Sequence, residues 1–390
     1  MTPTASRPVS LLRARDGHHA RVGFEELFFD LVYVFAVTQL AHLLLHHLSW
    51  TGAVEALILW FAVWLGWQYT SWMTNWFDPE TPRIRALLFG NMLLALLMAA
   101  SLPGAFSAQG WVFALTYVLM QVGLAGIIVL HLPRAHALAA NYRRILGWML
   151  IAAVFWIAGA LVEHTLRVAL WGLAVLCAYV SPMIGFALPG LGRSHTREWT
   201  IEGGHFAERC GLFVIVALGE TVLASGASLA RAGVWNADTV LALVSTFAST
   251  LALWWLYFGT SSKAATRVIT QSVDPGRIGA YFHYAHVILV AGIIVTAVGH
   301  DLVMGHPHDR PATAQLVALL AGPAIYLLGS AVYKNVVYGV LPMSHVTGAL
   351  ALLGVGLAVP HASLLVTGGL TTVILLAVGV WEARTCRHQA

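Results

Sequence analysis

Long apolar segments recur along the whole chain, and this feature most constrains what it can fold into. Each run has about 20 apolar residues, enough for a helix to cross a hydrocarbon core about 30 Å thick. The runs do not alternate polar with apolar residues, as the strands of a membrane β-barrel do. Only 10% of the 390 residues are charged, whereas a soluble domain carries about 25%. The sequence therefore predicts an all-α polytopic membrane protein whose first partner is the lipid bilayer.

The hydropathy pattern predicts about twelve transmembrane helices. They are expected at residues 24–46, 53–76, 84–104, 110–131, 144–162, 166–189, 206–228, 239–261, 278–300, 313–336, 342–359 and 362–383. The chain accordingly divides into an N-terminal segment (1–23), a first six-helix repeat (24–189), a polar linker (190–204), a second six-helix repeat (205–384) and a tail (385–390).

The loops alternate between basic and nearly neutral. With the N-terminus inside, the inner segments hold Arg7, Arg13, Arg15, Arg21, Arg83, Arg85, Arg134, Arg143, Arg144, Arg193, Arg197, Lys263, Arg267, Arg277, Arg384 and Arg387. The outer segments hold only Arg167, Arg231 and Arg310. Cytoplasmic loops carry the excess of Lys and Arg, so both termini are predicted to be cytoplasmic in a multi-pass protein of the cell membrane. This distribution accounts for the net charge of +4, which is no sign of nucleic-acid binding.

The two halves of the chain begin alike. Aligning Phe24 with Phe206 places Glu26 on Glu208, and one span later each half has an aromatic-rich segment, WLGWQYTSW and WWLYFGTSS. Six spans precede the linker and six follow it, so corresponding helices run in the same direction. The sequence predicts two parallel six-helix repeats related by an axis along the membrane normal.

Two motifs carry a family resemblance. FEELFFDLVYVFAVTQLAHLL at the start and HFAERCGLFVIVALGE near the middle resemble the bacterial low temperature requirement A family of membrane proteins. The resemblance extends from about Arg21 to the last span. The family name records a growth phenotype, so the resemblance implies the fold and leaves the biochemistry open.

The first predicted span carries acidic residues near its N-terminal end. Glu26 and Asp30 are four residues apart and share a helix face. An acid in the first turn complements the helix dipole, which explains Glu26 without a further role. Asp30 lies about two turns in, where a charge costs about 3 kcal/mol on insertion scales. We therefore expect Asp30 to be paired or functional.

The seventh predicted span carries a second set of ionisable residues. His205, Glu208 and Arg209 lie near its mouth, and Glu220 lies eleven residues after Arg209, about 16 Å deeper. Glu220 has no charged neighbour in sequence, so its partner must come from another helix. It is either a proton-coupling residue or a protonated carboxyl that ties two helices by a hydrogen bond.

The ninth predicted span places His283 and His286 on one face near its cytoplasmic end. We expect one of them to contact Glu208 or Arg209. Like His205, they are candidates for proton handling or substrate contact, since histidine titrates near neutral pH. A structural hydrogen-bonded pair is the alternative. No HExxH helix or cysteine pair accompanies them, so neither a metal nor another cofactor is expected.

Three further features have simple interpretations. Trp60, Trp64, Trp67 and Trp72 include expected interfacial anchors. Lys334, near the end of the tenth span, is expected to extend its ammonium group toward the interface. Gly322-Pro323 interrupts that span and predicts a kink where irregular backbone can line a cavity.

Three classes of function fit these residues. The favoured one is a secondary transporter or channel-like permease, coupled to protons through Glu220 and Asp30, with Glu26, Glu208 and Arg209 nearby. The second is an intramembrane enzyme acting on a lipid-linked substrate through its histidines and Glu208. The third is a membrane scaffold or sensor. No P-loop, Rossmann or nucleophile-elbow motif is present, so an enzyme is less expected; the substrate and any homo-oligomer are left open.

Overall fold

The computed structural model describes residues 11–13, 15, 20–134, 136–259, 268–269 and 271–387. The first half forms α1 (Phe24–His46), α2 (Trp50–Trp76), α3 (Pro82–Ser101), α4 (Gly110–His131), α5 (Ala137–Ala160) and α6 (His164–Met183). The second half forms α7 (Gly203–Arg231), α8 (Ala237–Trp254), α10 (Pro275–Gly305), α11 (Thr313–Tyr338), α12 (Met343–Ala358) and α13 (Leu364–Arg387). A π-helical turn (Trp255–Gly259) continues α8.

The predicted all-α membrane fold is confirmed. In the described part of the chain, 11 helices are long and apolar enough to cross a membrane. The remaining apolar helix, α12, has 16 residues and is about 24 Å long. It packs against α11 and α13 in the second half.

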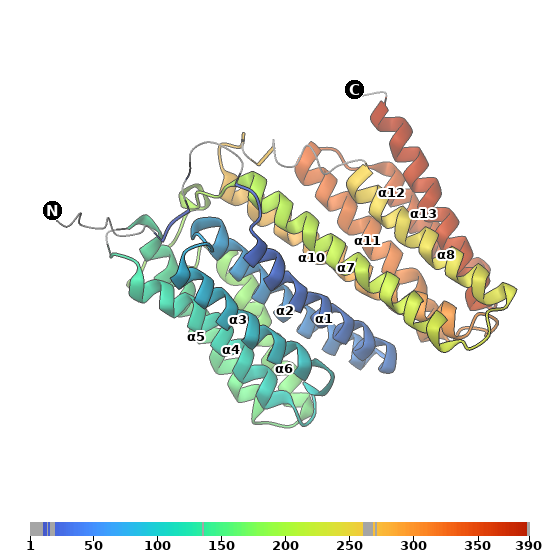
Figure 1. Cartoon of the computed structure of the whole chain (residues 1–390), viewed down its shortest axis with the longest axis horizontal. Coiled ribbons are helices and arrows are strands. Elements are labelled where there is room, and N and C mark those ends of the chain that lie inside the picture. Colours follow the sequence, from blue (N-terminus) through green and yellow to red (C-terminus); the bar gives the residue numbers. More distant parts are fainter. Residues whose placement is uncertain are drawn as a thin grey trace, which may run out of the picture.

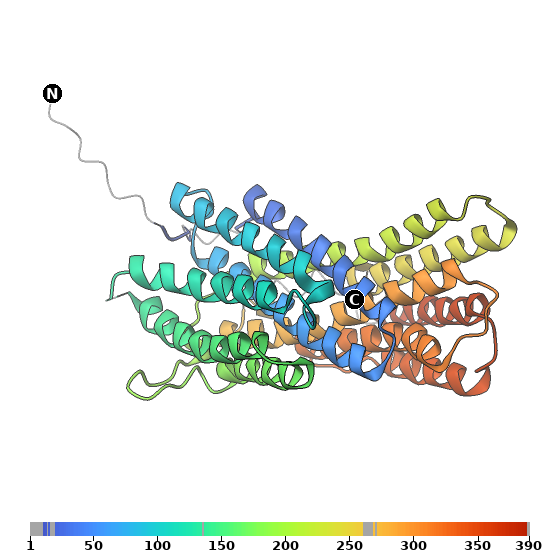
Figure 2. The same ribbon diagram turned by 90° about the horizontal axis from the view of Figure 1, so that it is seen from below.

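The helices gather into two groups that meet along a central contact (Figure 1). The first six helices lie on one side, and α8, α11, α12 and α13 lie on the other. Figure 2 shows the same division from below. Between the groups, α1 and α2 each touch both α7 and α10. Any relative movement of the halves must therefore change contacts along these four helices.

The same neighbours recur in each half. The first helix touches the second and third, successive helices from the third to the sixth touch one another, and the second touches the sixth. In these terms α7, α8, α10, α11, α12 and α13 correspond to α1 through α6. A parallel repeat requires such a pattern. The pattern supports the predicted repeat, which itself stays a prediction.

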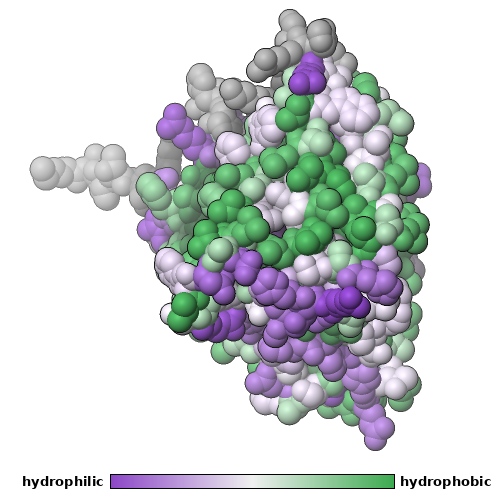
Figure 3. All heavy atoms as spheres, turned by 90° about the vertical axis from the view of Figure 1, so that its right-hand side faces the viewer, coloured by the Kyte–Doolittle hydropathy of each residue, from purple (hydrophilic) through white to green (hydrophobic). Residues whose placement is uncertain are grey.

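The outer surface is largely apolar, as lipid contact demands. Phe24, Phe28 and Leu31 of α1 are among many exposed large apolar side chains. Figure 3 shows one face on which hydrophobic residues cover a broad area beside a band of hydrophilic ones. Lipid is as apolar as these side chains, so exposing them to it costs little.

The tryptophans of α2 do not act as interfacial anchors, and that expectation was wrong. Trp60, Trp64, Trp67 and Trp72 are all buried. The Trp60 indole donates a hydrogen bond to the carbonyl oxygen of Val287 on α10 at 3.1 Å. These rings fill the contact between the two halves because α2 presents this face to α7 and α10 rather than to lipid.

The N-terminal segment, the α2–α3 connection and the linker lie at one end of the bundle. The Arg13 backbone N–H donates to the Trp76 carbonyl at 3.0 Å, and the Arg15 guanidinium donates to the Thr200 carbonyl at 2.7 Å. Arg7, Lys263, Arg267 and the side chain of Arg387 lie outside the described residues. Which side of the membrane this end faces stays a prediction.

Candidate functional site

A buried ion pair joins α1 to α7 near the end that holds the linker. The Arg209 Nη2 atom donates to Asp30 Oδ1 at 2.9 Å, with Arg209 0% and Asp30 3% exposed. The Trp67 indole of α2 donates to the same oxygen at 2.8 Å. The guanidinium also lies over the Trp67 ring, 5.6 Å from its centroid. Asp30 is therefore paired with a charge from the other half of the chain, as one of its two predicted roles required.

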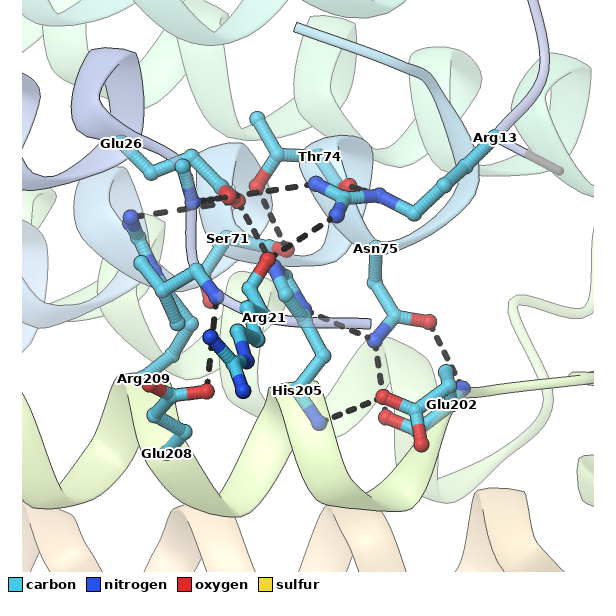
Figure 4. A network of polar contacts seen from close by, with 12 residues as sticks. Arg13, Arg21, Glu26, Ser71, Thr74, Asn75, Glu202, His205, Glu208 and Arg209 are labelled. Atoms are coloured by element: carbon cyan, nitrogen blue, oxygen red, sulfur yellow. Dashed lines mark hydrogen bonds and ion pairs between the residues drawn. The ribbon is translucent and has the colours of Figure 1, made fainter. Parts of the chain in front are cut away.

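Glu26 is the centre of a second set of contacts, one turn closer to the same end (Figure 4). Its Oε2 atom accepts from the Arg13 guanidinium at 3.1 Å and from the Gly23 backbone N–H at 2.9 Å. Its Oε1 atom lies 2.8 Å from His205 Nε2 and 4.0 Å from Arg209 Nη1. Glu26 thus caps α1 and links it to α7 and the N-terminal segment.

The network fixes the tautomer of His205. The Asn75 amide oxygen accepts from the Glu202 backbone N–H at 2.9 Å, which orients the amide. Its Nδ2 group therefore lies 3.1 Å from His205 Nδ1 as a donor. Nδ1 must accept, so the ring proton sits on Nε2 and is donated to Glu26. His205 is neutral in this arrangement, and the Arg13 and Arg209 guanidinium groups pair with Glu26 and Asp30.

Glu208 lies at the edge of this cluster rather than inside it (Figure 4). Its carboxylate accepts a hydrogen bond from the Val22 backbone N–H at 3.4 Å. The contact joins α7 to the segment that leads into α1. We call Glu26, Asp30, His205, Glu208 and Arg209, together with Arg13, the inner cluster.

Glu220 lies apart from the inner cluster, further along α7. It is 2% exposed, and its carboxylate accepts a hydrogen bond from the Thr38 hydroxyl of α1. Among the described residues it forms no ion pair. Glu220 therefore sits on the same α1–α7 contact as Asp30, with a neutral partner in place of a charged one.

His283 and His286 are buried, but the expected contact with Glu208 or Arg209 does not form. His283 stacks on Phe206 at 4.4 Å, and its Nε2 atom accepts from the Trp72 indole at 3.3 Å. His286 Nδ1 lies 2.7 Å from the Phe282 carbonyl, and its Nε2 atom lies 2.8 Å from the Tyr257 hydroxyl. The Trp67 ring contacts both His283 and the Arg209 guanidinium, so an aromatic ring takes the place of the expected direct contact.

A second charged group in α11, α12 and α13 escaped the sequence analysis. Lys334 Nζ lies 2.8 Å from Glu382, so the expectation that Lys334 extends to the interface was wrong. Glu382 also accepts from the Ser344 hydroxyl at 2.6 Å, with His345 3.7 Å away. The signal available was Glu382 itself, an acid inside the last apolar run.

A pocket of about 50 Å³ lies between α2, α4, α5 and α6. Tyr69, Trp72 and Tyr142 are among its walls, and Tyr284 of α10 reaches it from the second half. No Asp, Glu, Lys, Arg or His lines it. A neighbouring cavity of about 20 Å³ shares Tyr69 with it. Neither cavity is lined by Asp30 or Glu220.

Across the described residues, no group of three or more His, Cys, Asp or Glu side chains is arranged to hold a metal ion.

The fold and the inner cluster define a polytopic helical membrane protein whose halves are joined by buried ion pairs. The chain belongs to the bacterial low temperature requirement A family, whose sequence profile matches residues 21–380. This confirms the resemblance carried by the two motifs. An uncharacterized protein of Rhizobium meliloti (strain 1021) is 37% identical over 379 residues, covering 97% of this chain and 92% of that relative. No solved structure matches the chain.

Proposed function

We propose that the chain is a secondary transporter or channel-like permease in which Glu220 carries the coupling proton. The single observation behind this proposal is the setting of Glu220, buried on the α1–α7 contact with the Thr38 hydroxyl as its partner. An acid without a counter-charge in apolar surroundings favours its protonated form. When the carboxyl is exposed to water on one side of the membrane, it releases the proton. Alternating exposure of Glu220 to the two sides therefore carries protons across.

The inner cluster is the proposed gate on the side of the linker. Separating α1 from α7 there would break the Arg209–Asp30 pair and the His205–Glu26 contact. The pair leaves Asp30 Oδ2 and Arg209 Nε without hydrogen bonds among the described residues. Water that enters on opening can satisfy both atoms, which lowers the free-energy cost of separation.

The aromatic cavity is the proposed substrate site. Its wall is uncharged, and the Gln68 amide oxygen in it has no hydrogen-bond partner among the described residues. Tyr284 brings the second half to the same wall. An uncharged solute with an apolar body and one N–H or O–H donor matches these groups. The cavity must widen to admit such a solute, as alternating access requires.

The enzyme alternative has less support. Both ring nitrogens of His286 are engaged by Phe282 and Tyr257, and His283 is stacked against Phe206. Both side chains are fully buried, so neither ring is open to a lipid-linked substrate. The transport experiment below distinguishes the proposal from a scaffold or sensor role, for which no proton influx is expected.

Proteoliposomes with a trapped pH dye test the proposal. Proton influx is measured under an imposed pH gradient, with and without a panel of small uncharged aromatic alcohols and amides. We expect wild-type protein to move protons and Glu220→Gln, which keeps a hydrogen-bonding side chain, to abolish the pH-dependent influx. The matched control is Glu55→Gln, which changes a buried acid paired with His164 on α6. Wild-type influx in the Glu220→Gln protein, or none in the wild type, would make the carboxyl structural.

The orientation in the membrane is part of the same proposal. The excess of Lys and Arg in the loops at that end supports an orientation with the inner cluster and both termini on the cytoplasmic side of the cell membrane. Reporter fusions at the linker and at the C-terminus are expected to report cytoplasm. A periplasmic signal from either would reverse the assignment of the gate.

A further inference from the structure

The second half contains a small cavity walled by hydroxyl groups. It lies between α8, α11 and α13 on one side of Figure 1 and the central helix α10, and has a volume of about 10 Å³. That is room for about one water-sized guest. Six hydroxyl side chains line it, from Ser245, Thr246, Ser249, Thr296, Thr371 and Thr372. So many hydroxyl groups around one small space within the membrane call for a ligand.

Four of these six hydroxyl groups already donate their protons to backbone carbonyls. Thr246, Thr296 and Thr371 each donate to the carbonyl four residues earlier, at 3.0, 2.7 and 3.0 Å. Thr372 does the same at 2.9 Å. A hydroxyl has one proton and two lone pairs, so these four offer the cavity acceptors alone.

His300 adds an acceptor to the same wall. Its side chain is buried, with 4% exposed, and lines the cavity. The ring forms a hydrogen bond with the backbone of Thr221, while its Nδ1 atom has no partner among the described residues. A neutral imidazole that donates through Nε2 has a lone pair on Nδ1. This is an unpaired acceptor deep in the second half.

Pro323 alters the backbone hydrogen bonding in the wall of the cavity. Proline has no N–H, so the Leu319 carbonyl of α11 lacks its usual helical partner, and both residues line the cavity. Gly322 permits the close contact with α10 here, since a Cβ atom would lie 2.5 Å from the Thr296 nitrogen. The kink motif predicted from the sequence does border a cavity.

We infer that this cavity binds a sodium ion. Oxygen ligands suit hard cations, and a wall in which four of the six hydroxyl protons are donated elsewhere favours a guest that accepts no hydrogen bonds. No carboxylate lines the cavity, so a single positive charge suits it better than a divalent ion. The size admits an ion stripped of its water shell. The site lies outside the proton path through Glu220 and does not depend on transport.

Binding of radioactive ²²Na⁺ to the purified full chain in detergent tests this inference. We expect saturable binding of a single ion per chain, and weaker competition by K⁺ than by unlabelled Na⁺. Thr371→Val and Ser249→Ala each remove one ligand oxygen and should weaken binding roughly tenfold, equivalent to about 1.4 kcal/mol. Thr116→Val is the matched control, because that hydroxyl on α4 also donates one turn back, to Val112 at 2.7 Å.

Two further results keep the test decisive. Thermal unfolding of the wild type should shift upward in NaCl relative to choline chloride at equal ionic strength, since a ligand stabilises the folded state that binds it. Glu220→Gln should bind ²²Na⁺ like the wild type. The sodium site is therefore tested independently of the proton mechanism. Absence of saturable binding in the wild type, or unchanged binding in both cavity variants, would show that the cavity holds only water.

Discussion

Asp30 and Glu220 are two acids on one helix contact, and they are buried in different ways. Both lie between α1 and α7, with 3% and 2% of their surface exposed. Asp30 meets the Arg209 guanidinium and the Trp67 indole, whereas Glu220 meets the Thr38 hydroxyl. A guanidinium partner favours the charged form of a buried carboxyl, while burial without a counter-charge favours the protonated form. The α1–α7 contact is thus stabilised by an ion pair near the linker end, whereas further along it contains a carboxyl that can gain or lose a proton.

Arg209→Met gives the largest expected effect, because it removes the counter-charge and leaves Asp30 buried without an ion pair. Breaking a buried pair costs about 3–5 kcal/mol. We expect a fall of that size in the free energy of unfolding, measured by SDS titration of purified protein. The double variant Arg209→Met with Asp30→Leu should recover part of the loss. If it recovers nothing, the pair does not act as a unit.

His205→Ala is expected to have an intermediate effect. It removes a hydrogen bond to the Glu26 carboxylate and leaves Arg13 as the principal partner. Hydrogen bonds to charged groups contribute about 1.5–3 kcal/mol. The same titration should report a loss in this range, smaller than for Arg209→Met. An equal or larger loss would mean that the histidine, and not the arginine, holds the inner cluster together.

Glu220→Gln should change stability least, by less than about 1 kcal/mol, because the amide can still bond to Thr38. Arg231→Ala serves as a baseline. Its side chain is 71% exposed and reaches Asp301 at 3.3 Å, so its removal should cost about 0–1 kcal/mol. A loss for Glu220→Gln that approaches the Arg209→Met value would remove the contrast between the two acids.

The sequence predicted the positions of the spans well, but it predicted poorly which side chains contact one another between them. Apolar runs mark spans because the bilayer sets their length, and the helices lie close to the predicted positions. Hydropathy says little about which face of an apolar helix points inward. This is why Trp64 and Lys334 were assigned to the interface although both are buried.

In the candidate site, too, the sequence predicted that a residue needs a partner better than it predicted which partner that is. That Asp30 needs a partner follows from the cost of a lone charge, and the structure supplies Arg209. Arg13 could not be foreseen, because its role depends on the path of a loop outside the spans. His283 was misplaced because a spacing of three residues gives a common face without fixing which neighbour that face meets.

The separation of Asp30 and Arg209 in the chain has a consequence for biosynthesis. The two residues are 179 positions apart. At about 5–20 residues per second, a ribosome needs roughly 10–40 s to make the intervening chain. During that interval the first helix is in the membrane while its counter-charge has not been made. A nascent first half must hold its acids neutral or near water until α7 arrives, so a chain cut at the linker should be a substrate for membrane proteases.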